Sequence, residues 1–328
     1  MQPGEVSSSV RRRELMVVYV AGLLPFLGSL LRDFVILSRF PATAVNSFFR
    51  YFYLSNLIAL IPGEYIWTKY NTLSDRRIRI PSAEVLLLGL FTAAAAFIAF
   101  LGVGVISADW VLIPLFSVLA AYPIGITNGL KHYLTSKIVS AFPNVIMAGL
   151  TLVLAFRLSK SYLLSLLVTL AVFFPLVMRL NGVRTTSEQL NIRKTFRFIL
   201  LVAIPFLVFH MGNFLVLSFN VHKSRLVLWG NRISNYLFTF LLLAAPVFIN
   251  AIKNRPVKIS HFKKYILMAL AAVLALSAVS ALSAAASPEA ALVVLNAALA
   301  LFSSLVFYVV KIVVVRMIND GSGEWPAI

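Results

Sequence analysis

The sequence contains no cysteine, which excludes disulfides, thiolate metal ligands and thiol nucleophiles. Acidic residues are also scarce, because only 11 Asp and Glu are spread over 328 residues and they form no cluster. A Mg²⁺ site for pyrophosphate chemistry needs several oxygen ligands, and no group of carboxylates supplies them. The four histidines are separated from one another, so no paired zinc motif is present either. We therefore expect neither a metal nor any other cofactor, and we do not expect an enzyme.

The chain also has few long polar segments. Apolar runs of about 20 residues recur from one end to the other, and the polar connections between them are short. The chain is 60% hydrophobic, only 12% charged and has a mean hydropathy of +0.93, which excludes an ordinary soluble domain. The alternation of apolar and polar residues that is typical of membrane barrels is not seen. The sequence therefore predicts an all-α, polytopic helical membrane protein.

These runs predict ten membrane spans. They lie at residues 14–37, 45–67, 83–106, 109–130, 136–157, 160–180, 196–220, 226–252, 262–286 and 289–316. With the N-terminus in the cytoplasm, 21 of the 29 basic residues fall on the cytoplasmic side. Basic residues concentrate in cytoplasmic loops, so this alternation supports both the number of spans and the orientation. Membrane topology and anionic lipid, rather than nucleic acid, then explain the net charge of +18.

The longest polar connection divides the predicted spans into two lobes. This linker covers residues 181–195 and separates a six-helix N-terminal lobe, 14–180, from a four-helix C-terminal lobe, 196–316. Residues 1–13 and 317–328 are predicted to be cytoplasmic, so both termini face the cytoplasm. We expect the protein to lie in the cell (plasma) membrane.

Proline recurs within the predicted spans, at Pro25, Pro62, Pro114, Pro123, Pro143, Pro175, Pro205 and Pro246. Each proline removes a backbone donor and tends to kink its helix, which membranes tolerate where neighbours or water satisfy the freed carbonyls. Proline is also commoner in membrane helices in general. The repetition favours bent helices around a cavity over a tight, inert bundle.

Ionisable and amide groups interrupt the first, second and eighth spans. Arg32 and Asp33 lie in the first span, Arg50 in the second, and Asn231 and Arg232 in the eighth. Each ionisable group costs roughly 2.5–3.5 kcal/mol to insert, so such groups usually mark a polar cavity or pathway. The planar guanidinium suits bidentate phosphate binding, so these residues predict an anion site if they converge. The alternative is that the arginines extend to the outer lipid headgroups.

A single histidine, His210, lies in the seventh span with Asn213 close by. A lone histidine in an apolar helix is more often a packing residue than a proton relay. Both residues nevertheless remain candidates for coupling transport to an ion, because histidine titrates near neutral pH.

The residues around these charges resemble a known family. Leu31-Arg32-Asp33, Asn46-Ser47-Phe48-Phe49, Asn56-Leu57 and Glu64 are similar to the first two helices of the MurJ-type lipid II flippases. The family pattern there runs roughly Gly-x-x-Arg-Asp, Asp-Ala-Phe-Phe, Pro-Asn-Leu and Glu-Gly. Leu228-Trp229-Gly230-Asn231-Arg232 also resembles the family's Tyr-Tyr-Ala-Asp-Arg helix. These flippases belong to the multidrug/oligosaccharidyl-lipid/polysaccharide (MOP) flippase superfamily.

The resemblance implies a two-lobe bundle that moves a lipid-linked saccharide by alternating access around a cationic cavity. By position, it implies that Arg32 and Arg232 bind the pyrophosphate and that Asp33 pairs with or orients an arginine. The other candidates around the anionic headgroup are Asn46, Asn56 and Asn231, which lie in the matching motifs, and Arg50, which is added because it is a basic residue within the second span.

The chain departs from the family pattern at three points. Asn46 and Asn231 replace aspartates, and Ala59 stands where the family has a basic residue. The predicted helices are also fewer than in the family, so the second lobe is shortened and its repeat symmetry is incomplete.

The leading interpretation is a transporter that flips a polyprenyl-(pyro)phosphate-linked saccharide across the membrane. Two alternatives stay open. One is a cation-coupled small-molecule exporter of the same superfamily, which requires an acidic cavity. The other is a non-transporting scaffold for a membrane glycosyltransferase. The expected partners are membrane lipid and the lipid-linked saccharide, with a glycosyltransferase or a further copy of the chain as an additional candidate, and no nucleic acid.

Overall fold

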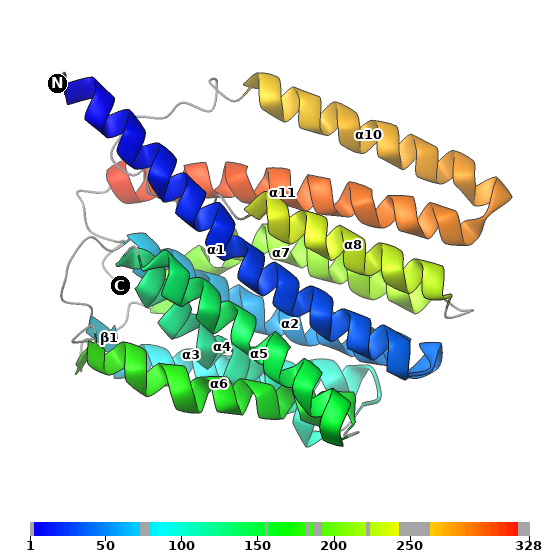
Figure 1. The fold of residues 1–328 in the computed structure, drawn as a ribbon, viewed down its shortest axis with the longest axis horizontal. Helices are drawn as coiled ribbons and strands as arrows, with labels where there is room; N and C mark the ends of the chain where they lie inside the picture. The colour runs from blue at the N-terminus through cyan, green and yellow to red at the C-terminus, as the bar shows by residue number, and fades with distance from the viewer. Residues whose placement is uncertain are drawn as a thin grey trace.

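The protein is a bundle of long helices (Figure 1). The computed structural model describes residues 3–72, 79–105, 107–130, 132–154, 157–180, 184–186, 192–220, 224–242 and 263–320. The helices are α1 (Pro3–Arg39), α2 (Ala42–Thr72), α3 (Ser82–Gly102), α4 (Ala108–Gly129), α5 (Tyr133–Leu154), α6 (Leu158–Leu180), α7 (Ile192–Phe219), α8 (Arg225–Leu242), α10 (Lys263–Ala286) and α11 (Pro288–Asp320). Seven of these helices are long and apolar enough to cross a membrane, so the chain is a multi-pass, membrane-embedded helical protein.

Each predicted span coincides with one of these helices, so the positions of the helices are confirmed. The eighth span, 226–252, matches α8 as far as Leu242, and its remainder lies outside the described residues. The seven helices that are apolar enough to span are α1, α3, α4, α5, α6, α10 and α11. Seven of the eight prolines lie inside helices as expected, and Pro246 lies outside the described residues.

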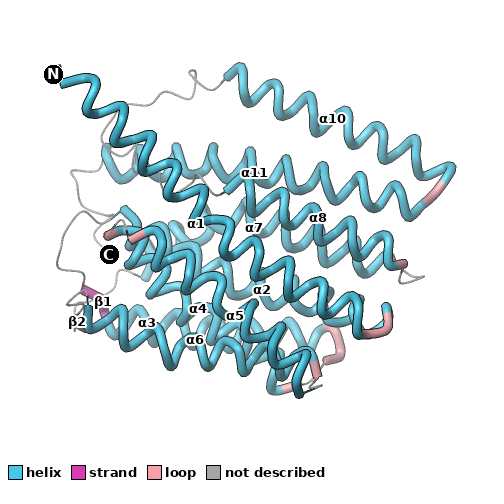
Figure 2. Tube along the Cα trace, in the orientation of Figure 1, coloured by secondary structure: helices cyan, strands magenta, loops and turns pink. Residues whose placement is uncertain are grey.

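Two short strands mark one end of the bundle, which we call the sheet end. β1 (Arg79–Pro81) and β2 (Arg184–Thr186) pair in parallel, with Arg79 opposite Arg184 (Figure 2). The strands belong to the α2–α3 and α6–α7 connections, so these connections meet at one end of the bundle. The N-terminus lies at the same end, whereas the α1–α2 and α10–α11 turns lie at the opposite end (Figure 1). The described parts of these two connections, β1 and β2, therefore lie on one side of the bundle.

Helix α2 lies at the centre of the packing. It packs extensively against both α4 and α7, while α1 packs against α5. Near the C-terminus, α11 packs against α7, α8 and α10, and α10 forms the edge of the bundle in Figure 1. The buried core between these helices is strongly aromatic, with Tyr53 of α2 against Phe209 of α7 and Phe49 packed on Phe52 within α2.

Glycines allow the backbones of neighbouring helices to approach closely at two contacts. A Cβ atom on Gly125 of α4 would lie 3.1 Å from the Trp67 Cα and 3.3 Å from the Ile66 carbonyl oxygen of α2. A Cβ atom on Gly28 of α1 would lie 3.2 Å from the Ala141 carbonyl oxygen of α5. Lipid supplies little hydrophobic driving force between helices, so such close backbone packing is an important source of stability.

We predict that Gly125→Ala destabilises the protein by about 1–3 kcal/mol, because the added methyl group meets backbone atoms that cannot rotate away. Gly149→Ala is the matched control, since a Cβ atom there meets nothing within 4 Å. The control should be neutral or stabilising, because alanine is the better helix former. Thermal unfolding of the detergent-purified variants measures both effects. Equal melting temperatures for Gly125→Ala and the wild type would contradict the close α2–α4 contact.

Candidate functional site

Asp33 of α1 is fully buried and lies at the centre of a charged cluster in the interior of the bundle. Its Oδ1 accepts a hydrogen bond of 2.8 Å from Nε of Arg32, and its Oδ2 accepts one of 2.6 Å from Nε of Arg232. Oδ2 also accepts a hydrogen bond of 2.6 Å from the Tyr236 hydroxyl. We call Asp33, Arg32, Arg232, Tyr53 and Tyr236 the Asp33 cluster. Two arginines that are far apart in the sequence thus share one carboxylate.

The arginines of the cluster extend to further helices. Nη1 of Arg232 donates a hydrogen bond of 2.9 Å to the Tyr53 hydroxyl of α2. Nη1 of Arg32 donates one of 2.5 Å to Oδ1 of Asn144 on α5. The cluster therefore joins α1, α2, α5 and α8 through polar contacts.

Aromatic rings cover both guanidinium groups. The guanidinium carbon of Arg232 lies 4.6 Å from the centroid of the Phe49 ring, and that of Arg32 lies 5.0 Å from the Phe52 centroid. Arg32 and Arg232 are only 3% and 0% exposed, so neither side chain extends to lipid headgroups. The ring faces and the carboxylate stabilise the two guanidinium charges and offset the cost of removing them from water.

The cluster carries more positive than negative charge. Two guanidinium groups face one carboxylate, which leaves an excess of one positive charge. One nitrogen of Arg232, Nη2, is buried and donates no hydrogen bond within the described part of the chain. The site therefore has both the charge and a donor to accommodate an additional anionic group.

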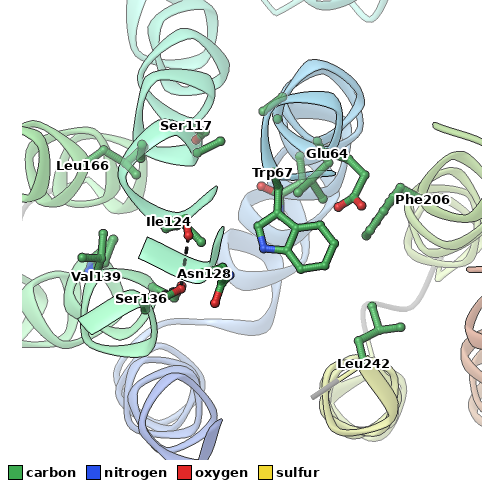
Figure 3. Close-up of a pocket in the computed structure, with 18 of the residues that line it drawn as sticks. Glu64, Trp67, Ser117, Ile124, Asn128, Ser136, Val139, Leu166, Phe206 and Leu242 are labelled. Carbon is green, nitrogen blue, oxygen red and sulfur yellow. Dashed lines mark hydrogen bonds between the residues drawn. The ribbon is translucent and has the colours of Figure 1, made fainter. Parts of the chain in front are cut away.

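A separate cavity of about 400 Å³ lies towards the sheet end of the bundle. Its polar lining comes mostly from α2, α4 and α5, and the apolar side chains of Phe206 and Leu242 lie on the facing side (Figure 3). Phe307 lines the cavity as well. The polar lining residues, together with Trp67 and Tyr162, are Asn56, Glu64, Ser117, Asn128, Ser136, Lys137 and Ser140. Neither Arg32 nor Arg232 lines this cavity, so the charged cluster and the open space are distinct features.

Among the other candidate headgroup residues, only Asn56 lines the cavity. Asn46 instead accepts a hydrogen bond of 3.1 Å from Asn220 and donates one to the Leu217 carbonyl, so it binds the end of α7. The guanidinium carbon of Arg50 lies 5.2 Å from the Phe214 ring centroid, and Nε of Arg50 has no hydrogen-bond partner among the described residues. The structure therefore does not bring Asn46 or Arg50 into the Asp33 cluster.

Asn231 belongs to an amide cluster beside the arginine that follows it. Its Nδ2 donates to Oδ1 of Asn213 on α7 and, over 3.4 Å, to Oδ1 of Asn296 on α11. The two coupling candidates thus have clear positions. Asn213 is part of this amide cluster, and His210 is buried with its ring 5.7 Å from that of Tyr53. Nδ1 of His210 has no hydrogen-bond partner among the described residues.

A second buried carboxylate, Glu84 of α3, was not identified from the sequence as part of a polar cluster. Its carboxylate accepts hydrogen bonds from Tyr70 at 3.1 Å, Tyr122 at 3.3 Å and Tyr65 at 3.4 Å, and it forms an ion pair with Lys69. These partners come from α2 and α4, so Glu84 holds three helices together near the sheet end. Its dense set of intramolecular partners indicates a structural role.

The sequence contained signals for some of the partners that the analysis missed. Tyr236 follows Arg232 by four residues, so both side chains lie on one face of α8. Ser136, Ser140 and Asn144 also recur every four residues and form a polar stripe along α5. Nothing in the local sequence marks Tyr53, because its contact with Arg232 links residues 179 positions apart.

Comparison of the chain with protein-family models, with curated proteins and with solved structures finds no match in any of the three.

We predict that Asp33→Asn destabilises the protein by about 3–5 kcal/mol, because it leaves two buried guanidinium groups without their counter-charge. Asp109→Asn provides the control, since Asp109 is half-buried and accepts a hydrogen bond from Ser159 near a helix end. The control should change stability by less than about 1 kcal/mol. Unfolding in detergent measures both variants. A stability of Asp33→Asn equal to that of the control would show that the carboxylate does not hold the cluster together.

Proposed function

We propose that this protein is a membrane transporter that flips a polyprenyl-(pyro)phosphate-linked saccharide by alternating access. The observation that carries the proposal is the convergence of Arg32 and Arg232 on one buried carboxylate. The resemblance to lipid II flippases implies that these two arginines bind the pyrophosphate. Their shared contact with Asp33 supports this assignment, because it places both guanidinium groups at one point. Their depth in an apolar bundle supports it further, since intramembrane charges without a function are rare.

The chemistry of the cluster fits an anionic headgroup. The excess positive charge and the buried Nη2 of Arg232 favour a ligand that carries phosphate oxygens. In this proposal a pyrophosphate replaces Asp33 as the partner of one or both arginines. The arginine fork then makes bidentate hydrogen bonds that are strong in a dry environment.

The proposed motion involves two lobes, α1–α6 and α7–α11. Arg32, Asp33 and Tyr53 belong to the first of these, and Arg232 and Tyr236 to the second. The contacts of Asp33 with Arg232 and Tyr236 therefore hold the lobes together in the half of the bundle away from the sheet end. The cavity lies in the other half, and this separation of the contact between the lobes from the open space supports a transporter that faces one side of the membrane.

Substrate drives this cycle only if it binds the two facing states with different affinity. The Asp33 cluster provides such a difference, because an anion that competes with Asp33 for Arg232 weakens the contact between the lobes. The same contact argues against a cation-coupled exporter, since both arginines already neutralise the Asp33 carboxylate.

We predict that Arg32→Ala and Arg232→Ala each reduce flipping of a fluorescent polyprenyl-pyrophosphate-linked saccharide in proteoliposomes by about tenfold or more. Each change removes a charge-assisted contact to the headgroup. Arg39→Ala is the control on the same helix, because Arg39 is exposed and, among the described residues, donates a hydrogen bond only to the Leu152 carbonyl. That variant should flip lipid at the wild-type rate.

The alanine variants also perturb a buried cluster, so Arg32→Lys and Arg232→Lys accompany them. Lysine keeps the charge but not the bidentate fork, so these variants should remain folded and flip slowly. Melting temperature and elution volume report folding for every variant. Undiminished flipping by both alanine variants would exclude these arginines as headgroup ligands.

A further inference from the structure

The cavity near the sheet end contains a lysine that forms no ion pair with a described residue, although the carboxylate of Glu64 also lines this cavity. Lys137 of α5 lines the cavity and is half-buried. It forms no ion pair or hydrogen bond with any residue that the structure describes. An ammonium group in a partly enclosed space attracts an anion, because the surrounding apolar atoms screen its charge poorly.

A buried amide on the neighbouring helix has an unused acceptor. Asn128 of α4 is only 1% exposed, and its side-chain oxygen accepts no hydrogen bond within the described residues. In Figure 3 its side chain points towards the interior of the cavity, beside Ser136 and Trp67. A buried acceptor without a donor is costly, so a ligand with a hydroxyl or amide hydrogen would stabilise this position.

The remaining wall suits the carbon skeleton of such a ligand. The indole of Trp67 projects into the space between Asn128 and Phe206 (Figure 3). The volume of about 400 Å³ falls within the range of small-molecule sites, which combine apolar walls with a few polar groups that fix orientation. A ligand that suits these three groups has an anionic charge for Lys137, a hydroxyl group for Asn128 and an apolar ring face for Trp67. A phosphorylated saccharide has all three.

We infer that this cavity is a loading site for a phosphate-linked saccharide, with Lys137 on the phosphate, Asn128 on a sugar hydroxyl and Trp67 against the sugar ring. The inference rests on the proposed function, because it places the same headgroup near the sheet end before the headgroup reaches the Asp33 cluster. It assigns an anion-binding role to Lys137 and a saccharide-binding role to Asn128.

Equilibrium binding to the full chain in phosphatidylcholine nanodiscs tests the site. The probe is radiolabelled farnesyl-pyrophosphoryl-N-acetylglucosamine, and farnesyl pyrophosphate serves as the same anion without the sugar. Lys137→Gln should weaken both probes about tenfold or more, because it removes the charge. Lys137→Arg should restore binding to within about threefold. Lys160→Gln is the control, since Lys160 is exposed near the start of α6 and should not affect either probe.

Asn128→Ala separates the saccharide from the phosphate. This variant should weaken the sugar-bearing probe about fivefold or more and leave farnesyl pyrophosphate unchanged, because only the sugar donates to the Asn128 oxygen. Melting temperature confirms that each variant is folded. Unchanged binding of both probes to Lys137→Gln would overturn the anion site. Equal loss of both probes, or of neither, in Asn128→Ala would overturn the saccharide contact.

Competition identifies the source of the phosphate-linked saccharide. Displacement of the probe by soluble UDP-N-acetylglucosamine would assign the site to a nucleotide sugar, and resistance to it would assign the site to a lipid-linked one. Displacement by phosphatidylglycerol nanodiscs would overturn the saccharide assignment in favour of an ordinary lipid headgroup.

These results are separable from those of the flipping assay. Normal flipping by Lys137→Gln together with unchanged binding defeats the loading site and leaves the flippase intact. Specific binding of the probe by a wild-type protein that does not flip lipid would support the binding site and defeat the flippase proposal.

Discussion

The carboxylate of Asp33 makes it possible to bury two guanidinium groups inside an apolar helix bundle. An unpaired ion in such surroundings costs several kcal/mol, and the cost is offset only when partners approach closely and satisfy its hydrogen bonds. Arg32 is the residue that precedes Asp33 on the same helix, but Arg232 lies 199 residues away in the sequence. The position of α8 against α1 is therefore specified by charge as well as by shape. The hydrogen bond of Arg232 to Tyr53 extends this constraint to α2, and the hydrogen bond of Tyr236 to Asp33 adds a second contact from α8.

Glu84 follows the same rule near the sheet end, where three tyrosines and Lys69 surround it. The two clusters differ in one respect that bears on function. Glu84 joins α2, α3 and α4, which are close in sequence, whereas Asp33 links helices from both halves of the chain. The Glu84 cluster therefore stabilises one local group of helices, whereas the Asp33 cluster joins the first half of the chain to the second. The polar cavity is lined by α2 and α4, the helices that supply the partners of Glu84.

The helices could be predicted from the sequence because an apolar run of about 20 residues has few other stable arrangements in lipid. Arg32, Asp33 and Arg232 could also be singled out from the sequence, since each is expensive within a span. Their convergence was not, because spacing along the chain does not determine which helices become neighbours. For the same reason the sequence did not reveal the partners of Glu84. Lys137 lies at the start of the predicted fifth span, and nothing in the sequence marked it as a site residue; only the structure shows that it lines a cavity.

The pairing of β1 with β2 has a mechanical consequence. The chain enters α3 and leaves α6 beside the same point, so the four helices between them form a closed loop that is fastened at one end. Backbone hydrogen bonds thus tie the two ends of this unit to each other at the sheet end. At the far end the link is of another kind, because there α1 and α8 are joined by side chains that share a single carboxylate.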